Sequence, residues 1–167
     1  GRVSKLLAAD GAAVDGFGRA VSVSGDTVAV GNDTQNGSVY VFQRNHGGTD
    51  NWGQVAKPFK TDWGLETRFV RSVSVSGDTL VAGAGADDDN GNSSGAAYVF
   101  DRHHGGTDNW GQVVKLLAAD GDGYEYFGMS VSVSGDTVVV AAYGDRDNGS
   151  ESGSAYVFGR NQGGADN

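Results

Sequence analysis

The chain has 167 residues, with 12 lysines and arginines against 21 aspartates and glutamates, and it contains no cysteine. The resulting net charge of -9 repels phosphate backbones, so no nucleic acid is expected as a partner. The lack of cysteine excludes disulfides, and no apolar run approaches the roughly 20 residues that a membrane-spanning helix needs. We therefore expect no membrane insertion and a partner of positive charge.

Three tandem copies of one pattern make up the chain. Tyr40-Val41-Phe42 returns twice, and so does the segment Val21–Thr27, while Lys5–Gly11 is identical to residues 115–121. Matches of this length indicate a repeat architecture. We place the copies at approximately residues 1–52, 53–110 and 111–167 of a single domain that spans residues 1–167.

Each copy predicts four short strands, taken here in chain order. Strand one covers Gly18–Ser24, where apolar and polar residues alternate, and strand two covers Thr27–Gly31 after the turn Gly25-Asp26. Strand three covers Ser38–Arg44, and strand four is clearest in the second copy, at Trp110–Ala118. Four strands repeated at this period are typical of a blade, so the predicted fold class is an all-β β-propeller.

The chain is predicted to hold three blades, cut at the start of strand four. Gly1 aligns with Gly53 and Gly111, so Arg2–Ala8 is expected to be a fourth strand without a blade of its own. Three blades cannot close a ring, because propellers have four to eight. We expect either a homodimer that closes a six-bladed ring or a fragment of a larger propeller.

The motifs also resemble a known family, the FG-GAP repeats. Phe17-Gly18 and Phe127-Gly128, the strand-two glycines and the recurrent Tyr-Val-Phe carry the resemblance. It departs in the second copy, where Val70 follows Phe69, and the proline of the family motif is replaced near Asn32, Gly85 and Tyr143. Such repeats build the N-terminal propeller of integrin α subunits and occur in bacterial surface proteins. The resemblance implies a binding or adhesion module with an extracellular or cell-surface location.

Two kinds of loop are considered as metal sites, and only the second is a candidate. The resemblance implies a calcium loop between strands one and two, but here that loop is a two-residue turn, which cannot supply six to eight oxygens. The loops between strands two and three carry alternating carboxylates that could bind calcium instead; the alternative is a series of Asx turns. The candidate ligands are Asp87, Asp89, Asp145, Asp147 and Glu151. The fold is expected to require no cofactor.

Aromatic residues fall into two groups. Trp52 and Trp110 recur at the start of strand four, which predicts packing within the blades. Trp63, Tyr124 and Tyr126 do not repeat strictly and lie in the loops that lead from strand four to the next strand one, beside carboxylates. We name them as candidate ligand-binding residues that could stack on sugar rings; packing against a neighbouring blade is the alternative.

Four functions stay open at this point. The first is a non-catalytic scaffold that binds a protein ligand or mediates adhesion, and the second is a sugar-binding lectin. The third is a purely structural repeat assembly, natural or designed, without a ligand. The fourth, an enzyme, is the least expected, because the chain lacks cysteine and any His-Glu-x-x-His motif.

Overall fold

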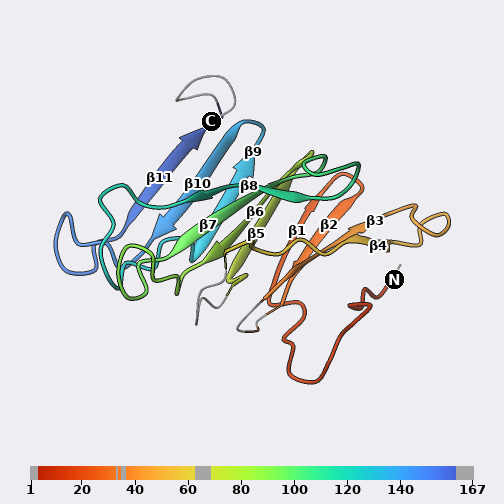
Figure 1. The fold of residues 1–167 in the computed structure, drawn as a ribbon, viewed down its shortest axis with the longest axis horizontal. Helices are drawn as coiled ribbons and strands as arrows, with labels where there is room; N and C mark the ends of the chain where they lie inside the picture. Colours follow the sequence, from red (N-terminus) through yellow and green to blue (C-terminus); the bar gives the residue numbers. More distant parts are fainter. Residues whose placement is uncertain (1–3, 33, 35–36, 63–68, 161–167) are drawn as a thin grey trace.

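The structure is a computed structural model that describes residues 4–32, 34, 37–62 and 69–160. All elements in this part are β-strands, so it holds no helix that could cross a membrane. The strands form three antiparallel sheets, which we call blades one, two and three and which follow one another from right to left in Figure 1. Blade one contains β1 (Ala20–Ser24), β2 (Thr27–Gly31), β3 (Val39–Gln43) and β4 (Gly53–Ala56). Blade two contains β5 (Ser72–Ser76), β6 (Thr79–Ala84), β7 (Ala96–Asp101) and β8 (Gly111–Leu116), and blade three contains β9 (Ser130–Ser134), β10 (Thr137–Ala142) and β11 (Ser154–Gly159).

The hairpins form where the sequence predicts them. Strand two of the first copy has the predicted bounds, and Ser24 pairs with Thr27 across the turn Gly25-Asp26. Gly25 adopts a φ of 55°, which a tight hairpin of this length favours and which glycine accepts at little cost. The carboxylate of Asp26 lies 3.1 Å from the guanidinium of Arg44, so the turn aspartate forms an ion pair within the blade.

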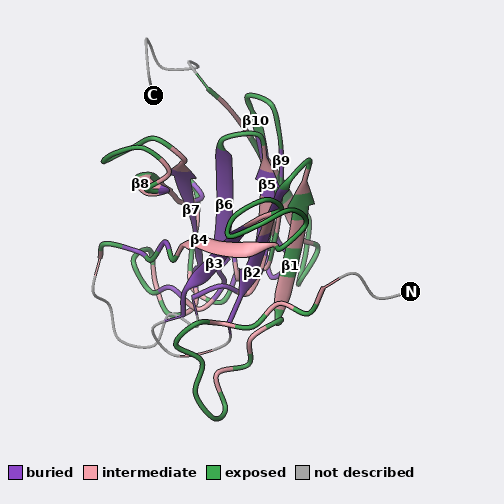
Figure 2. Cartoon of the chain, turned by 90° about the vertical axis from the view of Figure 1, so that its right-hand side faces the viewer, coloured by how far each residue is buried: buried purple, intermediate pink, exposed green. Residues whose placement is uncertain are grey.

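The blades stack through their first strands. Ser22 Oγ of β1 accepts the backbone N–H of Val75 in β5 at 3.0 Å, and Ser74 Oγ accepts the N–H of Val133 in β9 at 3.0 Å. Between the sheets lie two apolar cores, one shared by blades one and two and the other by blades two and three. Figure 2 shows the consequence: β6 and β7 are buried in the middle of the stack, while β1 is exposed at its edge.

The recurrent phenylalanine of each copy anchors strand three of its own blade. Phe69 packs edge-on against Tyr98 and lies 6.4 Å from Phe100, and Phe127 packs in the same way against Tyr156 and Phe158. Phe69, Tyr98 and Phe100 are fully buried. The Phe-Gly and Tyr-Val-Phe motifs are therefore two halves of one packing contact.

Val70, which stands where the other copies have glycine, keeps the glycine conformation. Its φ is 73°, against 94° at Gly18 and 92° at Gly128, and this region is strained for a β-branched residue. The side chain is fully buried and lies against Gly31 of blade one, where a Cβ would overlap it. Burial of the valine offsets the backbone strain.

The ends of the stack are open. β11 has one neighbouring strand in the described part of the chain, whereas β7 has two, and the three sheets do not close into a ring. Residues 4–8, which we predicted to form a strand, lie in no strand, and residues 1–3 fall outside the described ranges. A strand needs a partner edge, and in the described part of the chain no strand pairs with this segment. The fold is all-β and propeller-like.

Candidate functional site

The loops at one end of blades two and three interlock. The loop that follows β8 donates from Tyr124 N–H to Asn92 O at 2.7 Å and from Phe127 N–H to Ser94 O at 2.8 Å. It also accepts at Glu125 O from Gly144 N–H at 3.1 Å. The loop is thereby held by the β6–β7 loop of blade two and the β10–β11 loop of blade three. These bonds fix the side chains that the loop presents to solvent.

Tyr124, Tyr126 and Tyr143 form a surface that we call the tyrosine patch. The rings of Tyr126 and Tyr143 are stacked, with centroids 5.0 Å apart and planes 2° from parallel. Tyr124 is 50% exposed and Tyr143 52%, and the Tyr124 hydroxyl accepts from Asn92 Nδ2 at 2.9 Å. Two of the three predicted ligand-binding residues therefore lie in one patch, and the third, Trp63, lies outside the described residues.

Sequence reasoning missed two residues here, Tyr143 and the buried Glu125. Tyr143 replaces Gly85 of the second copy, and this single exchange at the end of strand two was the available signal. Glu125 lies between Tyr124 and Tyr126 and is buried, and its Oε2 has no hydrogen-bond partner among the described residues. A buried carboxylate without a partner favours a cationic neighbour.

A second polar group, the Lys115 cluster, joins blades one and two. It consists of Lys115, Tyr98, Asp62, Asp87 and Asp89. Lys115 Nζ donates to Asp62 Oδ2 at 2.7 Å, to Asp87 Oδ2 at 2.9 Å and to Asp89 Oδ2 at 2.7 Å, and it lies 5.1 Å from the centroid of the Tyr98 ring. The Tyr98 hydroxyl lies 2.8 Å from both Asp62 Oδ2 and Asp87 Oδ2, so the two carboxylates share its single proton.

Burial and charge together set the proton affinities in this cluster. Burial opposes the charge of Lys115, but hydrogen bonds to Asp62, Asp89 and Asp87 outweigh it and raise the Lys115 pKa. Burial tends to raise the pKa of Asp62, yet the hydrogen bonds from Lys115 and Tyr98 prevail and lower it. The pKa of Tyr98 is raised by burial and by the negative charge of Asp87. The cluster is a closed ion network at neutral pH.

Blade three holds the same cluster without a lysine. We call Tyr156, Asp120, Asp145 and Asp147 the blade-three cluster; these residues align with Tyr98, Asp62, Asp87 and Asp89. The Tyr156 hydroxyl donates to Asp120 Oδ1 and Asp145 Oδ2, both at 2.9 Å. The pKa of Asp145 is lowered, first by the backbone N–H of Asp147 and then by Tyr156.

The candidate calcium ligands lie in Asx turns. Asp87 Oδ1 accepts from Asp89 N–H at 3.3 Å, and Asp145 Oδ1 accepts from Asp147 N–H at 2.9 Å. Asp87 and Asp145 are buried, whereas Asp89, Asp147 and Glu151 are exposed. Across the described ranges, no three acidic or histidine side chains gather in a group that could hold a metal ion. In blade two, the ammonium of Lys115 occupies the space between the carboxylates.

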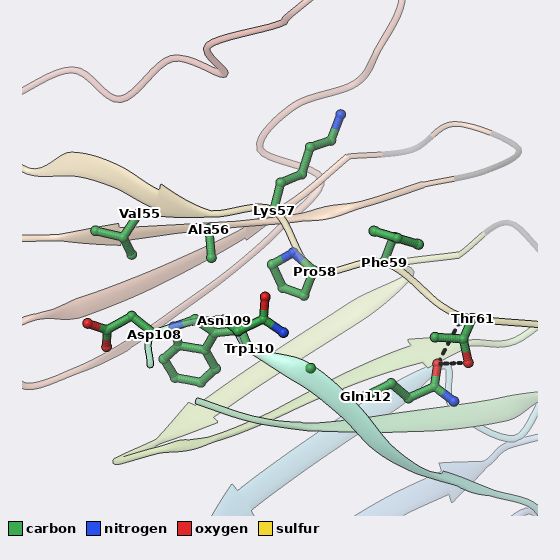
Figure 3. Close-up of a pocket in the computed structure, with 11 residues that line it drawn as sticks. Val55, Ala56, Lys57, Pro58, Phe59, Thr61, Asp108, Asn109, Trp110 and Gln112 are labelled. Carbon is green, nitrogen blue, oxygen red and sulfur yellow. Dashed lines mark hydrogen bonds between the residues drawn. The ribbon is translucent and has the colours of Figure 1, made fainter. Parts of the chain in front are cut away.

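A groove lies between the residues at the end of β4 and those at the start of β8 (Figure 3). Its volume is about 380 Å³, and Ala56 and Pro58 face Trp110 across it. Thr61 donates its N–H to Gln112 Oε1 at 2.8 Å beside the groove. Trp110 is buried, as predicted, yet its indole N–H has no partner in the described part of the chain, and Phe59 is 56% exposed.

One serine has the spacing of a nucleophile, which the sequence reasoning overlooked. Gly91–Gly95 reads Gly-Asn-Ser-Ser-Gly, and Ser93 adopts a φ of 53°. The segment joins two antiparallel strands, however, whereas the nucleophile elbow joins a strand to a helix. The Ser93 hydroxyl donates to Asn92 Oδ1 at 3.4 Å, so the geometry indicates a loop bond and not an activated nucleophile.

Comparison with known proteins agrees with the repeat structure. The computationally designed Ika4 protein is a solved structure with similarity to the chain, at 10% identity and a TM-score of 0.41, over 93% of this chain and 98% of that one. No curated protein matches the sequence. The profile of the FG-GAP repeat matches residues 1–42, 52–100 and 110–158, which together make up most of the chain. The chain therefore belongs to the FG-GAP repeat family.

Proposed function

We propose that the chain is a non-catalytic binding module, a propeller-type scaffold for adhesion, and that its ligand is a protein segment of positive charge. The observation that carries this proposal is the tyrosine patch, where the rings of Tyr126 and Tyr143 stack and Tyr124 and Tyr143 are about half exposed. Exposed tyrosines supply contact area with little loss of side-chain entropy, and they are enriched in protein interfaces. Exposed aspartates in the same loops supply charge complementarity to lysine or arginine.

The wider surface supports a basic partner. Asp122 and Asp147 are exposed in the same two loops that present Tyr124 and Tyr143, and the whole chain carries a net charge of -9. An acidic surface of this kind raises the rate at which a cationic ligand arrives. The family resemblance supports an extracellular or cell-surface location for such binding.

Sugar binding is the second candidate, and the groove beside Trp110 favours it. A largely apolar lining that includes Pro58 and Phe59 and a volume of about 380 Å³ are features of small-ligand sites. A sugar ring could pack on Pro58 and on Phe59, which is 56% exposed. A purely structural role without a ligand remains the third candidate.

Synthetic peptides and glycans distinguish the three candidates. The chain is immobilised and probed with an array of 15-residue peptides of graded net charge and, in parallel, with an array of glycans. We expect binding of lysine- and arginine-rich peptides, lost in Tyr124→Ser with Tyr143→Ser and retained in Phe59→Ser. If the chain binds glycans and Phe59→Ser abolishes this binding, the chain is a lectin and the proposal of a protein ligand is wrong. Binding of neither probe would leave the structural role.

We also propose that binding requires no metal cofactor. The carboxylates of the β6–β7 loop already bind Lys115, which supports this view for blade two. Calcium is the ion that the corresponding blade-three residues would suit. Thermal melting with calcium and with EDTA tests the proposal. A calcium-dependent rise in Tm that Asp145→Ala with Asp147→Ala removes would contradict it.

A further inference from the structure

Blade three has an unpaired edge strand, β11, among the described residues. The side chains of Ala97 and Val99 in β7 are buried, but the equivalent Ala155 in β11 is exposed and Val157 is 70% exposed, against 8% for Val99. In blade two, β8 pairs with β7 from Ala97 to Asp101. In the described part of the chain β11 has no strand equivalent to β8, and no following blade covers Ala155 and Val157 as blade three covers Ala97 and Val99.

The blade-three cluster lacks one charge at the same edge. Lys115 reaches Asp62, Asp87 and Asp89 from β8. Tyr156, Asp120 and Asp145 keep the corresponding hydrogen bonds to one another, but in the described residues no positively charged side chain from a fourth strand joins them. The missing group is an ammonium carried on a strand antiparallel to β11.

The N-terminal segment carries that ammonium. Lys5–Gly11 is identical to Lys115–Gly121, so Lys5 is the equivalent of Lys115. Leu6 and Ala8 already pack on the apolar core of blade one, just as Leu116 and Ala118 pack on the core of blade three. Ala9 N–H donates to Gln54 Oε1 at 3.1 Å, which repeats the bond from Thr61 to Gln112. The segment is placed as the end of a fourth strand that precedes blade one.

The two end faces of the stack are complementary. Val21 and Val23 of β1 are 67% and 66% exposed, whereas the equivalent Val73 and Val75 of β5 are buried by blade one. Ser132 of β9 is exposed at the other end, and it is equivalent to Ser22 and Ser74, which each accept a backbone N–H from the next blade. One end offers a serine hydroxyl, and the other offers valines together with the backbone N–H of Val23, which is equivalent to that of Val75.

We propose that blade three of one chain docks on blade one of a second copy, and that residues 4–8 of this copy add to β11 as its fourth strand. Lys5 then enters the blade-three cluster of the first chain, as Lys115 enters its own cluster. The exchange is reciprocal. Two copies give six blades and three would give nine, so a ring within the usual range of four to eight blades closes with two. Both exposed edges disappear, which stabilises the dimer.

Solution mass tests the docking faces. Light scattering after size exclusion should report twice the 17.1 kDa chain mass at micromolar concentration. Val157→Arg and Val21→Arg, one on each face, should each weaken the dimer about tenfold or more. Val113→Arg is the matched control, since Val113 is 45% exposed on β8, away from both faces, and this variant should stay dimeric. A parent chain at 17.1 kDa, a larger assembly, or a fully dimeric Val157→Arg would overturn the proposal.

A charge exchange tests the position of Lys5. Lys5→Glu and Asp147→Lys should each raise the dimer dissociation constant several-fold, because each places like charges together. The chain with both changes restores an opposite pair at both junctions and should recover most of the loss. If the double variant dimerises no better than the single ones, Lys5 does not reach the blade-three cluster. Circular dichroism confirms that each variant keeps its strands, so that loss of folding is not read as loss of the contact.

Discussion

Blades two and three carry the same side chains at equivalent positions but differ in how these are covered. Tyr98 is fully buried and Tyr156 is only half-buried, and Val99 is buried where Val157 is exposed. Asp87 accepts from Lys115 and Tyr98, whereas Asp145 accepts from Tyr156. Two things differ: blade two has the fourth strand β8, which carries Lys115, and it is followed by a blade that covers Val99. One repeat completes its core only when a fourth strand pairs with its edge and a further blade packs on its face, so stability depends on neighbours, as in other repeat proteins.

The largest expected effect is the loss of the strand-three phenylalanine, compared between blades two and three. Phe100→Ala should lower the free energy of unfolding by about 3–5 kcal/mol, because Phe100 is fully buried against Phe69. Phe158→Ala should cost less, because Phe158 is half-buried. Urea denaturation in the Val157→Arg background compares the two within a single chain. Equal losses would mean that blade three is as well covered as blade two.

The next effect concerns the ion network. Lys115→Met removes the cation from the buried carboxylate of Asp87, whose side chain is 2% exposed, and should cost about 3 kcal/mol. The equivalent Lys57→Met is the control, because the side chain of its partner Asp10 is 55% exposed, and little change is expected. Both are measured by urea denaturation at neutral pH. A cost for Lys57→Met equal to that for Lys115→Met would contradict the role given to burial.

The sequence predicted the repeat, the strand order and the hairpin turns, because these depend on local alternation and on glycine placement. It did not predict the Lys115 cluster, although the lysine, aspartate and tyrosine recur in register at Lys57, Asp10 and Tyr40. Their meeting depends on a loop from one blade crossing to the next, which is a tertiary feature. Tyr124 and Tyr126 were predicted as candidates but Tyr143 was not, because the stacking of Tyr126 on Tyr143 brings together two loops that the hairpin of β9 and β10 separates in sequence.

A third prediction compares two glycines of the Phe-Gly motif. A Cβ at Gly128 would overlap the carbonyl oxygen of Ala96, whereas a Cβ at Gly18 meets nothing within 4 Å, although both have a φ above 90°. Gly18→Ala should therefore cost about 1 kcal/mol of strain, and Gly128→Ala about 2–3 kcal/mol. Thermal melting of the monomeric Val157→Arg background measures both. If Gly18→Ala destabilises the Val157→Arg variant as much as Gly128→Ala does, other atoms must occupy the space beside Gly18 in solution.

The smallest effect is a difference in acid sensitivity between the two clusters. The pKa values of Asp62 and Asp145 are both lowered by folding, so their contribution to stability is present above the unfolded value of about 3.9 and is lost as pH falls through the folded values. The Lys115 pKa is raised, so its contribution is present below about 10.4 and is lost only as pH rises through the folded value. We expect stability to be flat between about pH 5 and pH 9 and to fall below about pH 4.

Asparagine substitutions separate the two clusters within this acid window. Asp145→Asn removes a carboxylate held by the Asp147 amide and Tyr156, and Asp62→Asn removes one held by Lys115 and Tyr98. Each variant should lose less Tm than the parent between neutral pH and about pH 3, because one protonation no longer accompanies unfolding. Asp62→Asn should also be less stable at neutral pH, since it leaves Lys115 with fewer acceptors. If the plots of Tm against pH for Asp145→Asn and the parent run parallel, folding does not lower the pKa of Asp145, and the prediction fails.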